Sequence, residues 1–398
     1  MNDNDTMPQT AKQSMQTRAI HGGRADKVEG AVTLPIFQSS TFAHSGDGHY
    51  DAVRYTRLSN GPNHDQLHTL LRALCGGEAA LVTGSGMSAI ATTLLALLGQ
   101  SDHLLVQRGV YGGTHALVHD DLPRWGIDAS TIDGRYPETW DAAVTDKTRL
   151  VYVETLTNPL VEQVDLQAVV AFAKRHGLVS VIDATFTSPI NVRPIALGFD
   201  LVVHSVTKYM AGHSDVIAGC VVGAAHHIRR IGHQLNHLGG SIDAHACFLV
   251  ERGLKTLPLR MRQHNANATA LAQLFTGHPE VERVHYPGFD GAPFVLDPRG
   301  APLLSGFGGV LSIVLRGGAA QADRFIAATK LMTHAPSLGG TETLITRPAT
   351  TSHAGVPEAE RVAIGIVDGL IRIACGIEGS QDLVDDATQA LAASMNEL

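Results

Sequence analysis

Residues 201–208 read Leu201-Val202-Val203-His204-Ser205-Val206-Thr207-Lys208. This stretch begins as a short apolar run, which is consistent with a buried strand, and it ends in two hydroxyls and a lysine. Some twenty residues earlier, the similar run Val179–Ile182 ends in Asp183. Ligands of open parallel sheets bind at the carboxyl ends of the strands. We therefore expect Asp183 and Lys208 to face the same crevice.

The residues around this stretch alternate between apolar runs and helical patterns. Near-continuous apolar runs are expected of strands that are covered on both faces. The helical segment Leu166–His176 ends at Gly177, a favourable helix C-cap. The alternation predicts an α/β fold with a mostly parallel central sheet. Besides the two runs above, we expect strands at Ala79–Val82, His103–Val106, Leu150–Val153 and Ile217–Val222, and a further helix at Met87–Leu98.

The pattern changes near Glu251–Asn267, which we expect to form one long helix. The strands expected beyond it, in a smaller C-terminal α/β domain, are Val281–Tyr286, Gly309–Leu315, Leu331–Thr333 and Leu370–Ala374. A chain of 398 residues exceeds the usual size of one domain. We predict an irregular N-terminal arm at residues 1–60, a large domain at 61–255 and a C-terminal domain at 256–398.

Composition disfavours several classes of function. The net charge is −8 and there is no long basic cluster, so we expect no nucleic-acid partner. The apolar stretch Ile90–Leu98 has about half of the roughly 20 residues that span a bilayer, and the polar N-terminus is unlike a secretory signal. The four cysteines are scattered without a C-x-x-C pair, which fits a reducing compartment, and we expect a cytoplasmic protein.

Two histidines, His233 and His237, stand four residues apart and could bind a metal ion from one face of a helix. The sequence offers neither an H-E-x-x-H pattern nor a third ligand nearby. We therefore expect no metal.

The first expected strand runs into Thr83-Gly84-Ser85-Gly86-Met87-Ser88-Ala89 and then into a helix. Glycines allow the backbone to approach a phosphate, and a helix N-terminus supplies free N–H groups. Gly84, Gly86 and Ala89 also match a dinucleotide fingerprint, which would indicate a nicotinamide-dependent oxidoreductase. That fingerprint requires an acidic residue about 20 positions later, where none is found. A purely structural turn is a third reading.

Pyridoxal 5′-phosphate (PLP) requires a lysine, a carboxylate and a phosphate cradle in one site. Lys208 would carry the cofactor as a Schiff base, and Asp183 would hold the pyridinium nitrogen. Ser205 and Thr207 alternate with the residue between them, so both could point at the phosphate. A lone lysine would be read as a surface charge, and a non-catalytic α/β binding protein is the corresponding alternative.

The segments Thr207-Lys208-Tyr209 and Gly212-His213-Ser214-Asp215 resemble the cofactor-lysine region of the Cys/Met-metabolism, or trans-sulfuration, enzymes. The resemblance extends from about Tyr55 to Glu378. It implies the PLP-dependent aminotransferase-like fold, fold type I, and a homotetramer of dimers with shared active sites. It implies that Lys208 and Tyr111 are catalytic, and it assigns the residues below to the binding of cofactor or substrate.

Around the cofactor, the resemblance places Tyr55 and Arg57 at the phosphate of the neighbouring subunit. Ser85, Gly86 and Met87 fall on the phosphate turn, and Tyr111 falls on the tyrosine that stacks on the ring. Asn158, within Glu154-Thr155-Leu156-Thr157-Asn158-Pro159, falls beside the ring edge and the substrate.

For the substrate, the resemblance implies that Ser337 and Arg372 contact the α-carboxylate of an amino acid. It also implies a PLP-dependent C–S lyase that performs β- or γ-elimination on cystathionine or a related thioether. γ-Replacement on an activated homoserine is the alternative. Methionine cleavage is disfavoured by Gly113, because methionine γ-lyases carry a cysteine at that place. Ala184 and Pro336 depart from the family pattern and leave the substrate open.

Overall fold

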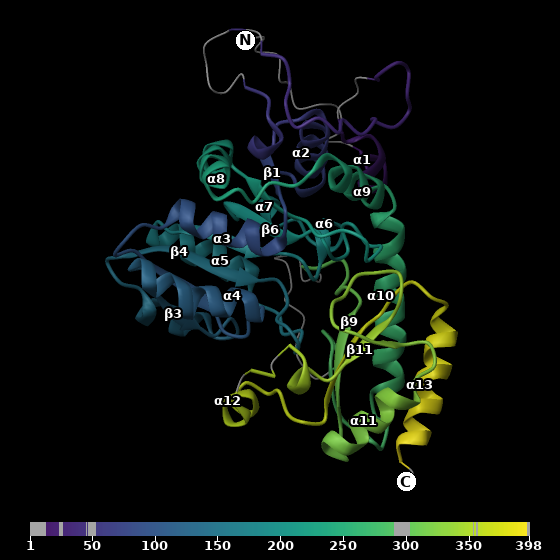
Figure 1. Ribbon diagram of the computed structural model, residues 1–398. Coiled ribbons are helices and arrows are strands. Elements are labelled where there is room, and N and C mark those ends of the chain that lie inside the picture. The colour runs from purple at the N-terminus through teal and green to yellow at the C-terminus, as the bar shows by residue number, and fades with distance from the viewer. Residues whose placement is uncertain are drawn as a thin grey trace.

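The computed structural model describes residues 13–23, 27–44, 46, 53–289, 303–352, 354–355 and 357–395. These residues form a seven-stranded sheet toward the N-terminal end and a five-stranded sheet toward the C-terminal end (Figure 1). The long helix α10 (Leu257–Phe275) runs alongside both. The predicted α/β class, with a second and smaller sheet, is confirmed, whereas the proposed domain limits at 60 and 255 stay predictions.

The large sheet has the strand order β1-β7-β6-β5-β4-β2-β3. Its strands are β1 (Ala79–Thr83), β2 (His103–Gln107), β3 (Asp128–Ile132), β4 (Thr148–Glu154), β5 (Val179–Asp183), β6 (Leu201–Ser205) and β7 (Gly219–Gly223). Only β7 runs antiparallel to its neighbours, so the sheet is mostly parallel as predicted. The edge strand β3 was not predicted, because its half-exposed sequence has no apolar run.

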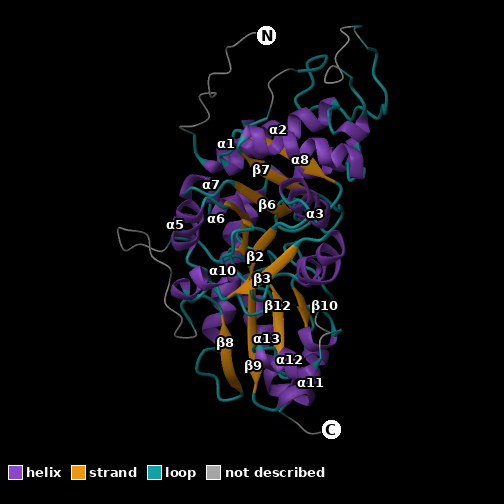
Figure 2. Ribbon diagram, turned by 90° about the vertical axis from the view of Figure 1, so that its left-hand side faces the viewer, coloured by secondary structure: helices purple, strands orange, loops and turns teal. Residues whose placement is uncertain are grey.

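Both faces of this sheet are buried, which explains the continuous apolar runs. Leu201 and Val203 pack in a core with helices α3 (Gly86–Leu97) and α8 (Ala225–Leu238). The alternate residue Val202 packs in the opposite core with α2 (Pro62–Cys75) and α5 (Leu166–His176). Figure 2 shows α5 and α3 on opposite sides of the strands.

Helix limits follow local signals where these are strong. Asp165 caps α5 by accepting hydrogen bonds from the N–H groups of Gln167 and Ala168, and Gly177 ends the helix in the left-handed conformation. The prediction of a single helix at Glu251–Asn267 is wrong. The chain instead forms α9 (Ala244–Leu254) and a new helix, α10, whose first turn contains Pro258, a residue that favours helix starts.

Among its described residues, the predicted irregular arm contains a short α-helix, α1 (Met15–His21), capped by the Ser14 side chain, and a 3-10 turn at Thr56–Leu58. Ala19 of this helix is buried in the core that α2 helps to form. A helix of seven residues is too short to show a clear 3.6-residue period. Residues 1–12 of the predicted arm lie outside the described residues.

The small sheet has the order β10-β11-β12-β9-β8 and is antiparallel except between β10 and β11. A core shared with α10, α11 (Gly318–Ala328) and α13 (Ser380–Ser394) packs against it. The prediction missed the three-residue strand β11 and placed β10 two residues early. The strands are β8 (Val281–His285), β9 (Val310–Leu315), β10 (Thr333–His334), β11 (Leu344–Thr346) and β12 (Leu370–Ala374).

The remaining helices are short and lie in the connections. They are α4 (Gly112–Ala116), α6 (Ser188–Asn191), α7 (Pro194–Leu197) and α12 (Glu358–Ala363). None of the helices in the described part of the chain is long and apolar enough to cross a membrane.

The topology argues against the nicotinamide hypothesis. Strand β1, which precedes Gly84 and Gly86, lies at the edge of the sheet, and among the described residues it pairs only with antiparallel β7. A dinucleotide-binding fingerprint instead follows a strand inside a parallel βαβ unit. The turn after β1 is therefore better explained by a different ligand.

Candidate active site

Three adjacent parallel strands, β4, β5 and β6, end at the same edge of the large sheet. Their last residues are Glu154, Asp183 and Ser205. Glu154 and Asp183 lie directly opposite each other in register. The expected gathering of polar groups at the strand ends is therefore present, and Lys208 follows three residues after β6.

Lys208 meets residues from the C-terminal part of the chain. Its Nζ donates a hydrogen bond of 2.6 Å to Ser337 Oγ. Arg372, in β12, donates to the Ser337 carbonyl at 2.9 Å and to Asn158 Oδ1 at 3.2 Å. Four residues predicted separately along the sequence are thus brought into one cluster.

The loop that carries Ser337 is fitted tightly against the lysine. Ser337 has a φ of +90°, a backbone conformation that residues other than glycine adopt only at an energetic cost. Gly339 approaches the backbone between Lys208 and Tyr209 so closely that a Cβ there would lie 2.5 Å from the Tyr209 nitrogen. The contact sets the separation between the loop and the lysine.

Electrostatics at this cluster destabilise the protonated form of the Lys208 amine. Burial lowers the pKa of Lys208 to about 8, with a further contribution from the positive charge of Arg372. Burial also lowers the pKa of Arg372 to about 10. Arg372 Nε is buried and has no hydrogen-bond partner among the described residues. The cluster therefore presents an incompletely satisfied guanidinium beside a lysine that loses its proton readily.

Asp183 is buried beside two other acidic groups. It accepts a hydrogen bond from the Thr185 N–H at 2.8 Å and lies 3.4 Å from the Tyr152 hydroxyl. Burial raises the pKa of Asp183, and burial together with the charge of Asp183 raises the pKa of Glu154 well above its ordinary value. A cation at Asp183 would offset this cost, so the site suits a protonated ring nitrogen.

The turn after β1 lies beside the end of β6. Ser85 caps α3 through its hydrogen bond with the Ser88 N–H, and a Cβ on Gly86 would lie 2.7 Å from Ser205 Cβ. The α3 N-terminus and Ser205 are therefore in contact, as a phosphate cradle requires. The Thr207 hydroxyl, which was also expected to point at the phosphate, instead donates to the Ala218 carbonyl at 3.1 Å.

Tyr111 stands at the N-terminus of α4 with 47% of its surface exposed. Its backbone N–H donates to Glu154 Oε1 at 2.8 Å, which ties it to the end of β4. A Cβ on Gly113 would lie 2.7 Å from the Tyr111 ring and 3.0 Å from Met87 Sδ. Met87 of the phosphate turn, Gly113 and the Tyr111 ring therefore lie together.

Tyr55 and Arg57 are tied to another part of the molecule. Arg57 donates to the Asn236 carbonyl of α8 at 2.7 Å, and its guanidinium lies 5.5 Å from the Tyr55 ring centre. Both side chains are exposed. Their predicted role at a neighbouring subunit's cofactor stays a prediction.

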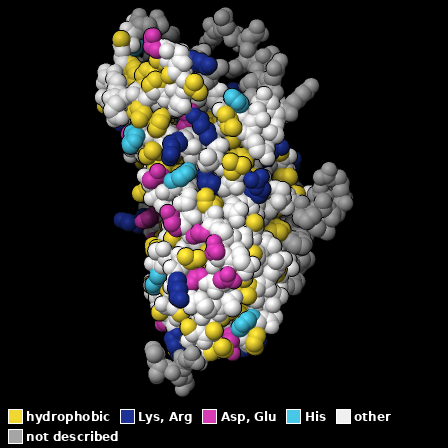
Figure 3. Space-filling model, turned by 90° about the vertical axis from the view of Figure 1, so that its right-hand side faces the viewer, with side chains coloured by type: hydrophobic (Ala, Val, Ile, Leu, Met, Phe, Trp, Pro, Cys, Tyr) yellow, Lys and Arg dark blue, Asp and Glu magenta, His cyan; other side chains and the backbone are white. Residues whose placement is uncertain are grey.

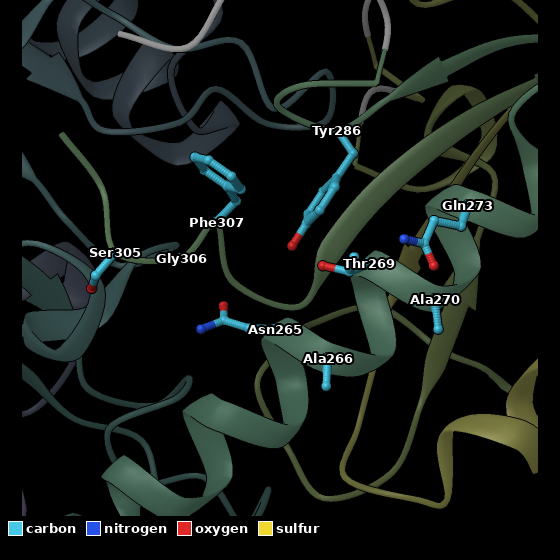
Figure 4. Close-up of a pocket in the computed structure, with 9 residues that line it drawn as sticks. All are labelled: Asn265, Ala266, Thr269, Ala270, Gln273, Tyr286, Ser305, Gly306 and Phe307. Atoms are coloured by element: carbon cyan, nitrogen blue, oxygen red, sulfur yellow. The ribbon is translucent and has the colours of Figure 1, made fainter. Parts of the chain in front are cut away.

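A cavity of about 410 Å³ opens elsewhere, between α10 and residues 305–307 (Figure 4). Tyr286, Asn265 and Phe307 are among its lining residues, and none of the predicted site residues is. His233 and His237 have their ring centres 4.4 Å apart on α8. Within the part of the chain that the structure describes, no group of three metal-ligating side chains is found.

Sequence reasoning missed residues that hold the site through hydrogen bonds. Gln107, at the end of β2, accepts from the Glu154 N–H at 2.8 Å, and Thr185 Oγ1 accepts from the Ser205 N–H at 2.8 Å. Arg260 donates to the Tyr209 carbonyl, next to Lys208. Gln107 was visible as a polar strand end, but neither Thr185 nor Arg260 has a local signal.

Comparisons with known proteins agree with this geometry. A family model described as Cys/Met metabolism PLP-dependent enzyme matches residues 16–392. Cystathionine gamma-lyase of Bacillus subtilis (strain 168) is 39% identical over 383 residues, covering 94% of this chain and 98% of that protein. Cystathionine beta-lyase of Lactococcus lactis subsp. cremoris (strain MG1363) is 38% identical over 380 residues, covering 95% and 99%. Relatives of similar identity are named L-methionine gamma-lyase.

Among solved structures, cystathionine gamma synthase from Xanthomonas oryzae pv. oryzae, in complex with aminoacrylate and cysteine, matches with a TM-score of 0.91. It is 38% identical, and the match covers 96% of this chain and 99% of that one. The predicted family, fold type I architecture and PLP cofactor are confirmed, and the predicted C–S lyase activity agrees with the relatives' names. The chain belongs to the Cys/Met metabolism family of PLP-dependent enzymes.

Proposed function

We propose that this enzyme is a C–S lyase that removes a thiol from the β or γ carbon of cystathionine or a related thioether amino acid. The observation that carries the proposal is the buried cluster in which Lys208 contacts Ser337 while Arg372 binds Ser337 and Asn158. In this cluster the Lys208 amine would transfer protons, and the Arg372 guanidinium beside it would bind the carboxylate of an α-amino acid. Relatives named cystathionine lyases support this substrate class.

The residues present fit the cofactor. Lys208 would hold it covalently, Asp183 would bind the ring nitrogen, and Tyr111 would cover the ring. Ser85, Gly86, Met87 and Ser205 would surround the phosphate. When bound, PLP supplies an electron sink that stabilises negative charge at the substrate's α carbon.

The side chains of the site would bind the substrate and move its proton. Arg372 would bind the α-carboxylate with its two-pronged guanidinium, and Ser337 and Asn158 would hold that guanidinium in place. Lys208, whose pKa of about 8 leaves a substantial neutral fraction near neutral pH, would take the α-proton. The exposed Tyr111 would close the site from its solvent side.

We further propose a cytoplasmic homotetramer built from dimers that share their active sites. Exposed apolar side chains support an assembly: Ile20 is 53% exposed, Val32 91% and Ile36 39%. Figure 3 shows apolar side chains gathered at the end of the molecule that carries the N-terminal segment. A second copy of the chain that covers this end would bury them.

A product assay tests the proposed reaction. Cystathionine should yield pyruvate by β-elimination or 2-oxobutyrate by γ-elimination, together with ammonia. In a parallel reaction, O-succinyl- or O-acetylhomoserine with cysteine should give little cystathionine. Rapid formation of cystathionine from the activated homoserine, without cleavage of cystathionine, would instead identify the γ-replacement enzyme.

Burial of Lys208 predicts a pH-dependent stability of the cofactor-free protein. The pKa falls from 10.5 to about 8 on folding, which corresponds to roughly 3 kcal/mol of destabilisation. The penalty is complete below pH 8 and disappears as pH rises toward 10.5, because the amine is then neutral in both states. Lys208→Met should therefore raise the midpoint of thermal denaturation at pH 7, and the gain should shrink by pH 10. Lys147→Met, at an exposed position, is the control; a gain of equal size at both pH values would contradict the prediction.

Replacing Arg372 should weaken substrate binding. Arg372→Lys keeps the positive charge but loses the planar fork, so KM should rise by about 100-fold if two charge-assisted hydrogen bonds are lost. Steady-state kinetics with cystathionine measure this change. Arg316→Lys, an exposed substitution near the same sheet, should leave KM unchanged. A normal KM in Arg372→Lys would remove this arginine from the carboxylate site.

Shared active sites predict rescue between two inactive variants. Arg57→Ala and Lys208→Ala should each be inactive alone, because each removes one half of every site. Mixed dimers would contain one site with both intact residues and should recover part of the wild-type activity. Verified mixed dimers without activity would show that Arg57 does not act on the neighbouring subunit.

A further inference from the structure

A buried arginine supports the loop that follows Lys208. Arg260 lies in the first turn of α10 and is only 4% exposed. Its Nη1 donates to the Tyr209 carbonyl at 2.6 Å, and its Nη2 donates to the Gly253 carbonyl at 2.7 Å. Its Nε donates to Thr256 Oγ1 at 3.0 Å. The guanidinium therefore joins the residue after Lys208 to the end of α9.

The charge of Arg260 is balanced by peptide groups. Among the described residues, no carboxylate forms an ion pair with it, and burial lowers its pKa to about 10. Gly253 belongs to the last turn of α9, where unsatisfied carbonyls carry partial negative charge. The desolvation free energy of a buried cation can exceed what its hydrogen bonds contribute, so stability alone is a poor explanation for Arg260. A role in placing the bound loop is the better explanation.

Close contacts leave the loop little room on either side. Gly212 has φ +73°, and a Cβ there would overlap the Arg260 guanidinium. On the other side, Gly339 lies against the nitrogen of Tyr209. The backbone of Tyr209 is thus held at its nitrogen by the loop of Ser337 and at its carbonyl by Arg260.

Helix α10 also holds the side chain of Tyr209. The Tyr209 ring packs edge-on against His264, with 4.9 Å between ring centres, and its hydroxyl accepts from the Gly309 N–H at 2.7 Å. His264 lies one helical turn after Arg260. The same face of α10 therefore contacts both the backbone and the ring of the residue next to Lys208.

We propose that Arg260 is a positioning residue, which acts through the Tyr209 carbonyl to set the place of the Lys208 amine relative to Ser337 and Arg372. The inference rests on the proposed role of Lys208. Displacement of a reacting group by about 1 Å can reduce turnover about 100-fold. Loss of Arg260 should therefore affect turnover far more than substrate binding.

The test compares three variants as purified holoenzymes. Arg260→Met removes the hydrogen bonds, and Arg260→Lys retains a charge that can reach one carbonyl. Gly212→Ala pushes the guanidinium from the opposite side. Kinetics give kcat and KM, and pH titration of the visible cofactor band reports the surroundings of the cofactor-bound lysine. Phe325→Leu, in the buried core of the small sheet, serves as a control for a general loss of stability.

Arg260→Met and Gly212→Ala should lower kcat by about 100-fold with little change in KM, and should shift the midpoint of the band's titration. Arg260→Lys should fall between Arg260→Met and wild type. Phe325→Leu should lower thermal stability without moving the midpoint. Wild-type kcat and midpoint in Gly212→Ala and in Arg260→Lys would overturn the proposal, even if Arg260→Met fails to fold.

The two proposals fail in distinguishable ways. Borohydride reduction followed by peptide mapping of the wild-type enzyme should find the cofactor on Lys208. A label on another lysine would contradict the proposed function itself. A label on Lys208, with kcat and titration unaffected by the Arg260 and Gly212 variants, would contradict only the positioning role.

Discussion

Two cations, Lys208 and Arg372, are buried close together, and the arrangement of the site depends on how their charges are accommodated. Burial, with a further contribution from the charge of Arg372, lowers the pKa of Lys208 to about 8. Ser337 contacts both groups, through its hydroxyl and its carbonyl. One loop residue thus joins the amine to which we assign proton transfer and the guanidinium to which we assign binding of the substrate's α-carboxylate.

The two sheets must be held in a fixed relation for this contact to exist. Lys208 follows a strand of the large sheet, whereas Arg372 lies inside a strand of the small one. Asn158 extends from the large sheet to bind Arg372, and Gly339 brings the Ser337 loop against the backbone of Lys208. Helix α10 contacts both parts: Arg260 donates to the Tyr209 carbonyl, and His264 is hydrogen-bonded to the Cys375 carbonyl just after β12. Small changes in this packing would alter the distance between the amine and the guanidinium.

A second group of polar residues lies at the ends of β4 and β5. Asp183 and Glu154 share the ends of adjacent strands, and their raised pKa values indicate that a positively charged ligand group would be favoured there. Tyr111 is fixed at its backbone by Glu154 but has an exposed ring. Under the proposed function, the acidic group would bind the ring nitrogen of the cofactor and the cationic group would bind the amino-acid substrate.

The sequence by itself determined the strands whose apolar runs are buried on both faces, and it determined Asp183 and Lys208 at their ends. It also indicated the turn at Gly86 and, through a specific resemblance, the family. Tertiary structure alone decided that Lys208 touches Ser337, that Thr207 is already hydrogen-bonded to Ala218, and that Arg260 holds Tyr209. Strand ends are predictable because burial leaves a local pattern in the chain. Contacts between residues 51 to 214 positions apart leave none, since they depend on how two sheets and a helix pack.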